Sequence, residues 1–370
     1  MSASYEFWLC DDSGRRITLL PNISFASFSR TTRGLGTIML GLPLDSYLSY
    51  VPIIFQPDMR IDCWRSPEYG YPKRREGSFF LRKYNVYDRA DDGVRMIDFY
   101  GRSPLDILRR WCVIGAVASR YTKTDCIDNI MKAVVTDSFI TDAEVVPLGE
   151  FSVDGNLSLG PSITQSFQGK NIRDILDDLK ATSFNMNATL ATNRRIFFDV
   201  VEGPGLTNGF GYIFRTYADL RGIDRTKGIV FSAENGNLKR TSYYEDYLDE
   251  ITIAQVGAIT VNGVDTNLSR WNNILRYQGS SSSVAGADTA KANELLYTLG
   301  KKFSLTASFL STPGSPSQPR SLYGVDWDLG DLLPVQFAGK NMTAEVEIVW
   351  ISIDENGKEN IVGSNQVGLQ

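Results

Sequence analysis

Short apolar runs separated by turn-forming residues dominate the first hundred positions, a pattern that is typical of antiparallel strands. Strands are predicted at EFWLCD, RITLL, GTIMLGLPL, MRIDCWR, SFFLRKYNVYD and VRMIDFYG. The last two flank RADDG, whose Asp-Gly pair favours a hairpin. In RIDCWR, Ile61 and Cys63 alternate with charged residues, as on a half-buried strand. Short strands at this spacing predict an antiparallel barrel or sandwich.

The pattern changes to helical periodicity near residue 103. Ser103 is a candidate N-cap with Pro104 at the first helical position. A second helix is predicted after Thr124, its expected cap, with an apolar face of Ile127, Ile130, Met131 and Val134. A third is predicted after Asn171, its expected cap, with a face of Ile172, Ile175, Leu176 and Leu179. NATLATNRRIFFDVVEG is predicted to form a hairpin, so this region is a mixed α+β segment.

Strand patterns return near residue 224 and continue to the end. Strands are predicted at GIVFSAEN, ITIAQVGAITVNGV, NNILRYQG and MTAEVEIVWISIDENGKENIVG, and a helix at ADTAKANELLYTLGKKFS. STPGSPSQPR lacks a core face and is interpreted as a linker. We therefore predict a β domain over 1–110, an α+β region over 111–223 and a second β domain over 224–370.

Composition narrows the classes of function. The 370 residues are 42% hydrophobic and 22% charged, as in an ordinary soluble globular protein. A net charge of −5 provides no basic field for nucleic acid or an anionic membrane. No signal peptide and no membrane span is predicted, so synthesis and folding in a cytoplasm are expected.

Histidine is absent from the sequence. This excludes Ser-His-Asp and Cys-His catalysis, histidine metal sites and a histidine pH switch. Four cysteines are scattered without a CxxC pair, which favours reduced and mostly buried thiols.

Three aspartates lie close together in YGVDWDLGDLLPVQF, where they suggest a metal loop, an acid/base pair or a polar turn. The spacing does not fit an EF-hand, which needs a glycine at position 6 and a glutamate at position 12. A carboxylate pair for glycan hydrolysis would use Asp326 and Asp328. We favour a structural turn made by Asp326, Asp328, Gly330 and Asp331, with Tyr323 and Trp327 packed beneath it. No catalytic, cofactor-binding or metal-binding residue is predicted.

A basic stretch, RSPEYGYPKRREG, is predicted to project as a loop from a hairpin. Its basic and aromatic residues could form a nucleic-acid patch, but the rest of the chain is acidic, so a solvated or assembly-contacting loop is favoured. The assembly-loop candidates are Arg65, Tyr69, Tyr71, Lys73, Arg74 and Arg75.

Several segments together give a resemblance to a known family. These are FSRTTRGLGTIMLGLPL, FLRKYNVYD followed by DFYGRSPLDILRRWCVIGA, NIRDILDDLKATS, GIDRTKGIVFSAENGNLKR and YGVDWDLGDLLPVQFAGK. Their order resembles the phage tail hub family of long-tailed phages, which is similar to contractile-tail baseplate hubs and to the N-terminal hub part of tail-associated lysins. The resemblance covers nearly the whole chain, although residues 265 to 285 keep less of the family pattern.

The resemblance implies a non-enzymatic virion protein with two tail-tube-like antiparallel β-barrels flanking a mixed α+β region. It implies a homotrimer that forms a pseudo-sixfold ring at the tail tip, lets DNA pass during ejection and needs no cofactor. Its expected partners are the distal tail protein ring, the tail tube, the tape measure protein and tail-tip fibre or other baseplate proteins. We expect an acidic channel, which would repel phosphate. A tail-tip glycan or cell-wall hydrolase and a host-carbohydrate-binding module remain alternatives.

Overall fold

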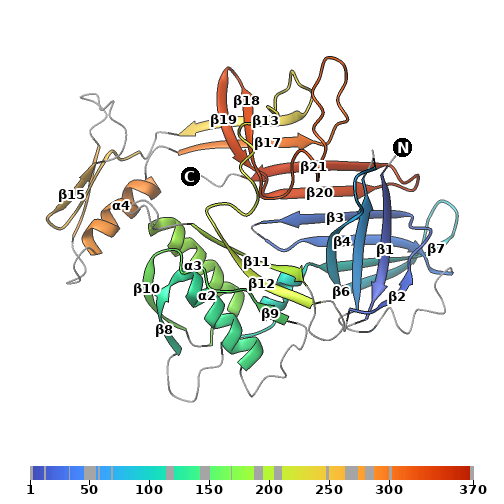
Figure 1. The fold of residues 1–370 in the computed structure, drawn as a ribbon, viewed down its shortest axis with the longest axis horizontal. Coiled ribbons are helices and arrows are strands. Elements are labelled where there is room, and N and C mark those ends of the chain that lie inside the picture. Colours follow the sequence, from blue (N-terminus) through green and yellow to red (C-terminus); the bar gives the residue numbers. More distant parts are fainter. Residues whose placement is uncertain are drawn as a thin grey trace.

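The structure is a computed structural model and describes most of the chain. The described residues are 3–11, 14–32, 34–45, 56, 59–67, 70–113, 121–141, 151–167, 169–186, 195–203, 211–246, 250–262, 274–279, 287–299 and 302–366. The predicted fold class, mainly β with an α+β insert, is confirmed (Figure 1).

The N-terminal strands are β1 (Ser4–Cys10), β2 (Arg16–Leu19), β3 (Phe25–Thr31), β4 (Thr37–Pro43), β5 (Arg60–Ser66), β6 (Arg74–Asp88) and β7 (Arg95–Arg102). Six of these seven strands lie where strands were predicted, and β3 was not predicted. The predicted hairpin at RADDG joins β6 to β7, and Gly93 adopts the positive φ that such a turn requires.

The C-terminal strands extend the same sheet. They are β13 (Leu238–Asp246), β17 (Lys302–Leu310), β18 (Leu332–Phe337), β19 (Lys340–Glu345), β20 (Ile348–Ile353) and β21 (Glu359–Gln366). β20 pairs antiparallel with β3, so one sheet of 11 strands runs in the order β13-β17-β21-β20-β3-β4-β7-β6-β5-β1-β2. The first and last predicted domains therefore share a sheet.

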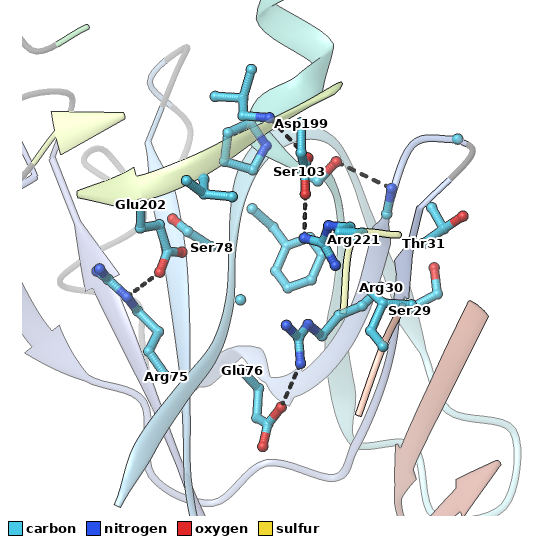
Figure 2. Close-up of a pocket in the computed structure, with 18 residues that line it drawn as sticks. Ser29, Arg30, Thr31, Arg75, Glu76, Ser78, Ser103, Asp199, Glu202 and Arg221 are labelled. Carbon is cyan, nitrogen blue, oxygen red and sulfur yellow. Dashed lines mark hydrogen bonds and ion pairs between the residues drawn. The ribbon is translucent and has the colours of Figure 1, made fainter. Parts of the chain in front are cut away.

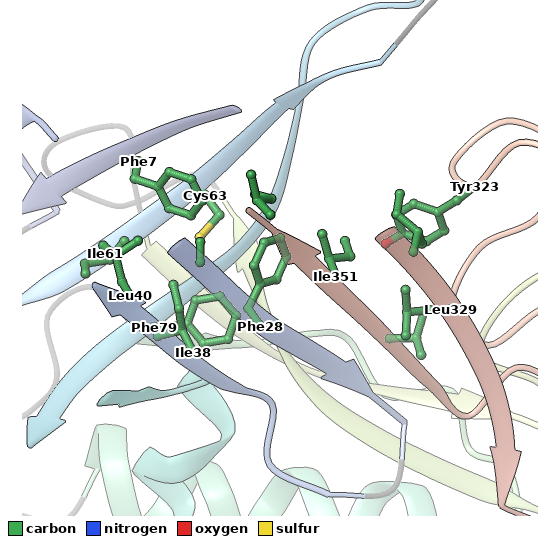
Figure 3. Close-up of a cluster of buried hydrophobic side chains, with 14 of the residues drawn as sticks. Phe7, Phe28, Ile38, Leu40, Ile61, Cys63, Phe79, Tyr323, Leu329 and Ile351 are labelled. Atoms are coloured by element: carbon green, nitrogen blue, oxygen red, sulfur yellow. The ribbon is translucent and has the colours of Figure 1, made fainter. Parts of the chain in front are cut away.

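A single hydrophobic core lies against this sheet. Phe28 and Ile351, which pair across β3 and β20, are both buried in it. Phe7 and Phe79 come from the N-terminal strands, and Tyr323 comes from the C-terminal region (Figure 3). Because both ends of the chain fill the same core, neither set of strands buries its apolar face alone.

The middle region has its own core, at the bottom of Figure 1. Its elements are η3 (Pro104–Arg109), β8 (Tyr121–Cys126), α2 (Ile127–Thr136), η4 (Asp137–Thr141), β9 (Phe151–Val153), β10 (Ser162–Phe167), α3 (Ile172–Met186), β11 (Ile196–Gly203) and β12 (Gly211–Ala218). The predicted apolar faces of α2 and α3 are buried against each other and against β11 and β12.

A smaller unit lies between β13 and β17 in the chain, at the left of Figure 1. It contains β14 (Ile253–Val256), β15 (Ile259–Asn262), β16 (Leu275–Gln278) and α4 (Ala287–Leu299), and the helix packs against β14 and β15. The helix was predicted. β14 and β15 lie in the predicted strand segment ITIAQVGAITVNGV, and β16 lies in the predicted strand segment NNILRYQG.

Some local predictions were wrong. Thr124 lies on β8 and bonds to Thr164, and α2 begins after Cys126 instead. Ser103 is the N-cap residue of η3 and Pro104 follows it, as predicted, but the Ser103 hydroxyl makes no capping bond and accepts the Gly36 N–H instead. GIVFSAEN forms turns around an isolated bridge at Phe231, not a strand. The Asn171 cap is confirmed, since its side chain accepts a bond from the Arg173 N–H at 2.9 Å.

The division into 1–110, 111–223 and 224–370 stays a prediction. In the part of the chain that the structure describes, no helix is both long enough and apolar enough to span a membrane.

Candidate functional site

The predicted turn of aspartates is present, and each carboxylate has a separate structural role. The Asp326 carboxylate accepts the Leu322 N–H at 2.7 Å and pairs with Arg320. Gly330 supplies the predicted positive φ of 86°. Tyr323 and Trp327 are buried beneath the turn, with ring centroids 5.2 Å apart, as predicted.

Asp331 connects this turn to a distant segment. Its buried carboxylate accepts the backbone N–H groups of Asp328 and Ile223, at 2.8 and 2.7 Å, and pairs with Arg225 at 2.6 Å. The backbones are equally close, because a Cβ on Gly222 would lie 2.4 Å from the Gly330 carbonyl carbon. The motifs GIDRT and YGVDWDLGD, which carried part of the resemblance, therefore pack against each other.

Asp328 belongs to a charged cluster under the sheet, which we call the Tyr323 cluster. Its members are Arg30, Arg65, Arg74, Glu76, Tyr323, Asp328 and Glu359. β3, β5 and β6 supply the first four residues, while the C-terminal turn and β21 supply the other three. The cluster thus joins the two ends of the chain by charge as well as by the sheet.

Glu76 is the centre of the Tyr323 cluster. Its side chain has no exposed surface and takes bonds from Arg74 at 2.7 Å, Arg30 at 3.3 Å and the Tyr323 hydroxyl at 2.9 Å. Tyr323 in turn accepts Arg30 at 2.6 Å. Burial raises the pKa of the Tyr323 hydroxyl well above its ordinary value, so it stays a neutral donor.

Asp328 closes the network from the C-terminal side. It accepts Arg74 at 2.7 Å and Arg30 at 3.2 Å. Burial by itself would raise the pKa of Asp328, but the charges of Arg30 and Arg74 outweigh it, and the pKa is lowered. An acid in a hydrolase needs the opposite shift.

Arg65 and Glu359 form a second link of the same cluster. Two parallel bonds of 2.9 and 2.7 Å join the guanidinium to the carboxylate. Tyr5 donates to Glu359 at 2.6 Å, and burial raises the pKa of Tyr5. Bidentate pairing fixes orientation as well as charge.

A second cluster, the Glu202 cluster, joins the sheet to the middle region. Its members are Arg60, Asp62, Arg75, Ser78, Glu202 and Tyr212. Arg60 and Asp62 are buried and pair at 2.9 Å, and Ser78 bridges Asp62 to the Tyr212 hydroxyl. Burial raises the pKa of Glu202 to about 7, although the paired Arg75 opposes the shift.

A cavity of about 240 Å³ lies between the two clusters. Figure 2 shows Arg30 and Glu76 on one side and Arg75 with Glu202 on another, while Arg221 and Asp199 come from the middle region. The three arginines lining it are each paired with a carboxylate, Arg30 with Glu76, Arg75 with Glu202 and Arg221 with Asp199. The arrangement holds the parts of the chain together and presents no unpaired acid to a substrate.

Half of the residues predicted to lie in a projecting basic loop lie on strands instead. Arg65, Arg74 and Arg75 lie on β5 and β6 and pair inside the chain, so their placement in a projecting loop was wrong. Lys73 pairs with Glu6, and Tyr71 accepts a bond from Arg320. Tyr69 lies outside the described residues, and any role of the six in assembly stays a prediction.

Sequence reasoning missed Arg30, Glu76 and Glu359 of the Tyr323 cluster. One signal was present, because Arg60-x-Asp62 and Arg74-x-Glu76 place opposite charges two apart on strands, hence on one face. Their partners come from positions far away in the sequence, which no local pattern identifies. Among the described residues, no three Cys, Asp or Glu side chains gather as metal ligands would.

Only the comparison with solved structures found proteins similar to this chain. No protein-family model matches the sequence, and no curated protein matches it. The 43 kDa tail protein of prophage MuSo2 from Shewanella oneidensis is a similar solved structure, with 12% identity and a TM-score of 0.55 over 98% of this chain and 97% of that one.

Two further solved structures match at similar length. A tail protein from Neisseria meningitidis MC58 has 10% identity and a TM-score of 0.53 over 99% of this chain and 96% of its own. Prophage tail protein gp18 from Listeria monocytogenes EGD-e has 12% identity and a TM-score of 0.53 over 98% and 94%. The chain therefore has the fold of phage tail proteins, which confirms the resemblance at the level of the fold.

Proposed function

We propose that this chain is a structural virion protein, the hub of a phage tail tip or baseplate. The observation that carries the proposal is the shared fold, which extends over nearly the whole length of this chain and of three tail proteins. The two charged clusters support it, because their charged side chains pair with one another and join the N-terminal strands to the C-terminal strands and to the middle region.

In detail, the hub is a homotrimer whose three chains form a pseudo-sixfold ring. The ring joins the tail tube and the distal tail protein ring to the threefold tip, contacts the tape measure protein and tip fibres or other baseplate proteins, and lets DNA pass. The protein is made in the host cytoplasm and resides in the virion. The resemblance and the sheet shared between both ends of the chain support this arrangement.

The first test is the mass of the purified protein in solution, combined with negative-stain images. A trimer with a central channel is expected. A protein that stays monomeric at all accessible concentrations would contradict the homotrimer, and the host-wall assays below would then take priority.

A hydrolase using Asp326 and Asp328 is the alternative from another class. The structure disfavours it, because Asp326 is bonded to Arg320 and Leu322, and Asp328 is held by two arginines. Purified protein incubated with host cell wall should release no fragments, and saturable binding of host polysaccharide should be absent. Turnover that disappears in Asp326→Asn would reverse this conclusion.

A further inference from the structure

Two turns of the structure contain the same Asn-Gly dipeptide. The sequence has four such pairs, and two of them lie wholly within the described residues, Asn356-Gly357 in the hairpin between β20 and β21 and Asn235-Gly236 in the turn before β13. In both turns the glycine has a positive φ, 74° at Gly357 and 68° at Gly236. The glycine N–H donates to the carbonyl three residues earlier, at 2.9 Å in the first turn and 3.1 Å in the second. Sequence and turn geometry therefore do not distinguish the two sites.

The two asparagine side chains differ in how they are held. The Asn235 amide nitrogen donates to the Val230 carbonyl at 2.8 Å, so this side chain is fixed. Asn356 is exposed, and within the part of the chain that the structure describes its side-chain amide bonds to nothing. The Asn356 side chain can therefore rotate until its Cγ meets the next backbone nitrogen, whereas Asn235 has to break a bond first.

The two glycines differ in the space around them. A Cβ at Gly236 would lie 2.8 Å from the Gln318 side-chain nitrogen, so Gln318 covers this turn. A Cβ at Gly357 would meet no atom within 4 Å. Because glycine has no side chain of its own, nothing screens the Gly357 nitrogen once its turn bond opens. The same turn bond has to open in Gly236, so the bond does not favour either site.

We propose that Asn356 is a site of spontaneous covalent modification, in which its side-chain amide becomes an acid through the backbone of Gly357. Asparagine is one of the thermolabile residues of proteins. The Gly357 nitrogen gives its proton to hydroxide and bonds to Cγ of Asn356, the bond from Cγ to Nδ2 breaks, and Nδ2 leaves as ammonia with a proton from water. One water molecule then opens the resulting five-membered imide at either carbonyl carbon, which gives aspartate or isoaspartate. Nothing is oxidised or reduced, and the reaction does not depend on the hub function proposed above.

The modified turn is linked to the Tyr323 cluster. Glu359, the first residue of β21, is paired with Arg65. The Asp354 carboxylate accepts the N–H groups of Asn356 and Lys358, at 3.0 and 2.9 Å. Isoaspartate adds one carbon to the main chain between these two N–H groups, and either product adds a negative charge to a turn that already holds two carboxylates. We therefore expect the modification to weaken the hairpin that carries Glu359.

The test follows both sites in one sample by peptide mapping. Purified folded protein is kept in mildly alkaline buffer, and mass spectrometry measures the conversion of amide to acid at each asparagine over time. We expect conversion at Asn356 to be at least tenfold faster than at Asn235, with isoaspartate among the products and ammonia released. Asn360 is the matched control, because it is exposed but is followed by Ile361, whose branched side chain screens the next backbone nitrogen. Asn360 should not convert.

Unfolded protein separates the effect of the fold from the effect of the sequence. In concentrated guanidinium chloride, Asn356 and Asn235 should convert at the same rate, because the bond and the cover at Asn235 are lost. Equal rates at the two sites in the folded protein would overturn the proposal. It would also be overturned if folded protein showed no conversion at Asn356 while the unfolded chain converted there.

The variant Asn356→Gln tests the consequence for the hairpin. Its longer side chain would have to form a larger ring, so position 356 should no longer convert. Wild-type protein aged in the alkaline buffer should melt at a lower temperature than fresh protein, whereas aged and fresh Asn356→Gln should melt at the same temperature. An equal loss on ageing in both proteins would assign the loss to another site and overturn the effect on the hairpin.

Discussion

Arg74 and Asp328 lie 254 positions apart in the sequence, yet the Arg74 Nη1 is 2.7 Å from the Asp328 Oδ2. The bond joins β6 of the N-terminal strands to the turn that precedes β18. Arg30 and Glu76 share the same contact, so one buried network fastens the beginning of the chain to its end.

Replacing Glu76 by Gln should be strongly destabilising. The substitution removes the buried charge that Arg30 and Arg74 share, although both arginines keep Asp328 as a partner. Losing hydrogen bonds to a charged group costs about 1.5–3 kcal/mol. Urea unfolding followed by fluorescence measures the change. Asp178→Asn is the matched control, because Asp178 pairs with Lys170 at the surface and should contribute less than about 1 kcal/mol. Equal effects of both substitutions would contradict the role of Glu76.

Tyr323→Phe should cost about 2 kcal/mol, because the hydroxyl both accepts from Arg30 and donates to Glu76. In a double-mutant cycle with Glu76→Gln, the double variant should lose clearly less unfolding free energy than the two single variants lose together. The reason is that both substitutions break the same bond. Tyr277→Phe, on an exposed ring, should leave the unfolding free energy unchanged. Strict additivity of Tyr323→Phe and Glu76→Gln would argue against a shared network.

Asp331→Ala should lower the free energy of unfolding by about 3 kcal/mol. Two backbone N–H groups and Arg225 lose their acceptor in a buried place. Asp224→Ala is the control, because Asp224 directly follows Ile223, is exposed and accepts bonds from Thr226 in the same turn. A thermal-shift comparison in which both variants have the melting temperature of the wild type would contradict the structural role of Asp331.

Glu202 should make stability depend on pH. Its pKa is about 7 in the folded protein against an ordinary value of 4.5, so the folded state binds the proton more tightly than the unfolded state. That contribution is complete below pH 4.5 and is lost as the pH rises through about 7. The wild type should therefore lose stability relative to Glu202→Gln between pH 4.5 and 7, as measured by urea unfolding at several pH values. Parallel pH profiles of the two proteins would contradict the raised pKa.

The local patterns of the sequence predicted much of the fold. The apolar faces of α2 and α3, the Asn171 cap, the RADDG hairpin and the turn at Gly330 depend on contacts within a few residues, and each was identified correctly. The prediction of Thr124 as a cap was wrong because its hydroxyl bonds to Thr164, which lies 40 positions away on the paired strand. The loop placement of Arg65, Arg74 and Arg75 failed because their carboxylate partners come from distant segments.

The sequence by itself determined the fold class, the order of the β and α+β segments and the exclusion of histidine chemistry, because periodicity and composition are local properties. Only the tertiary structure decided that β3 pairs with β20 and that Glu76 lies between two arginines. Strand pairing and buried charge pairing join residues that are hundreds of positions apart. Their energies depend on which partners the fold brings together, which the hydrophobic pattern of either partner does not specify.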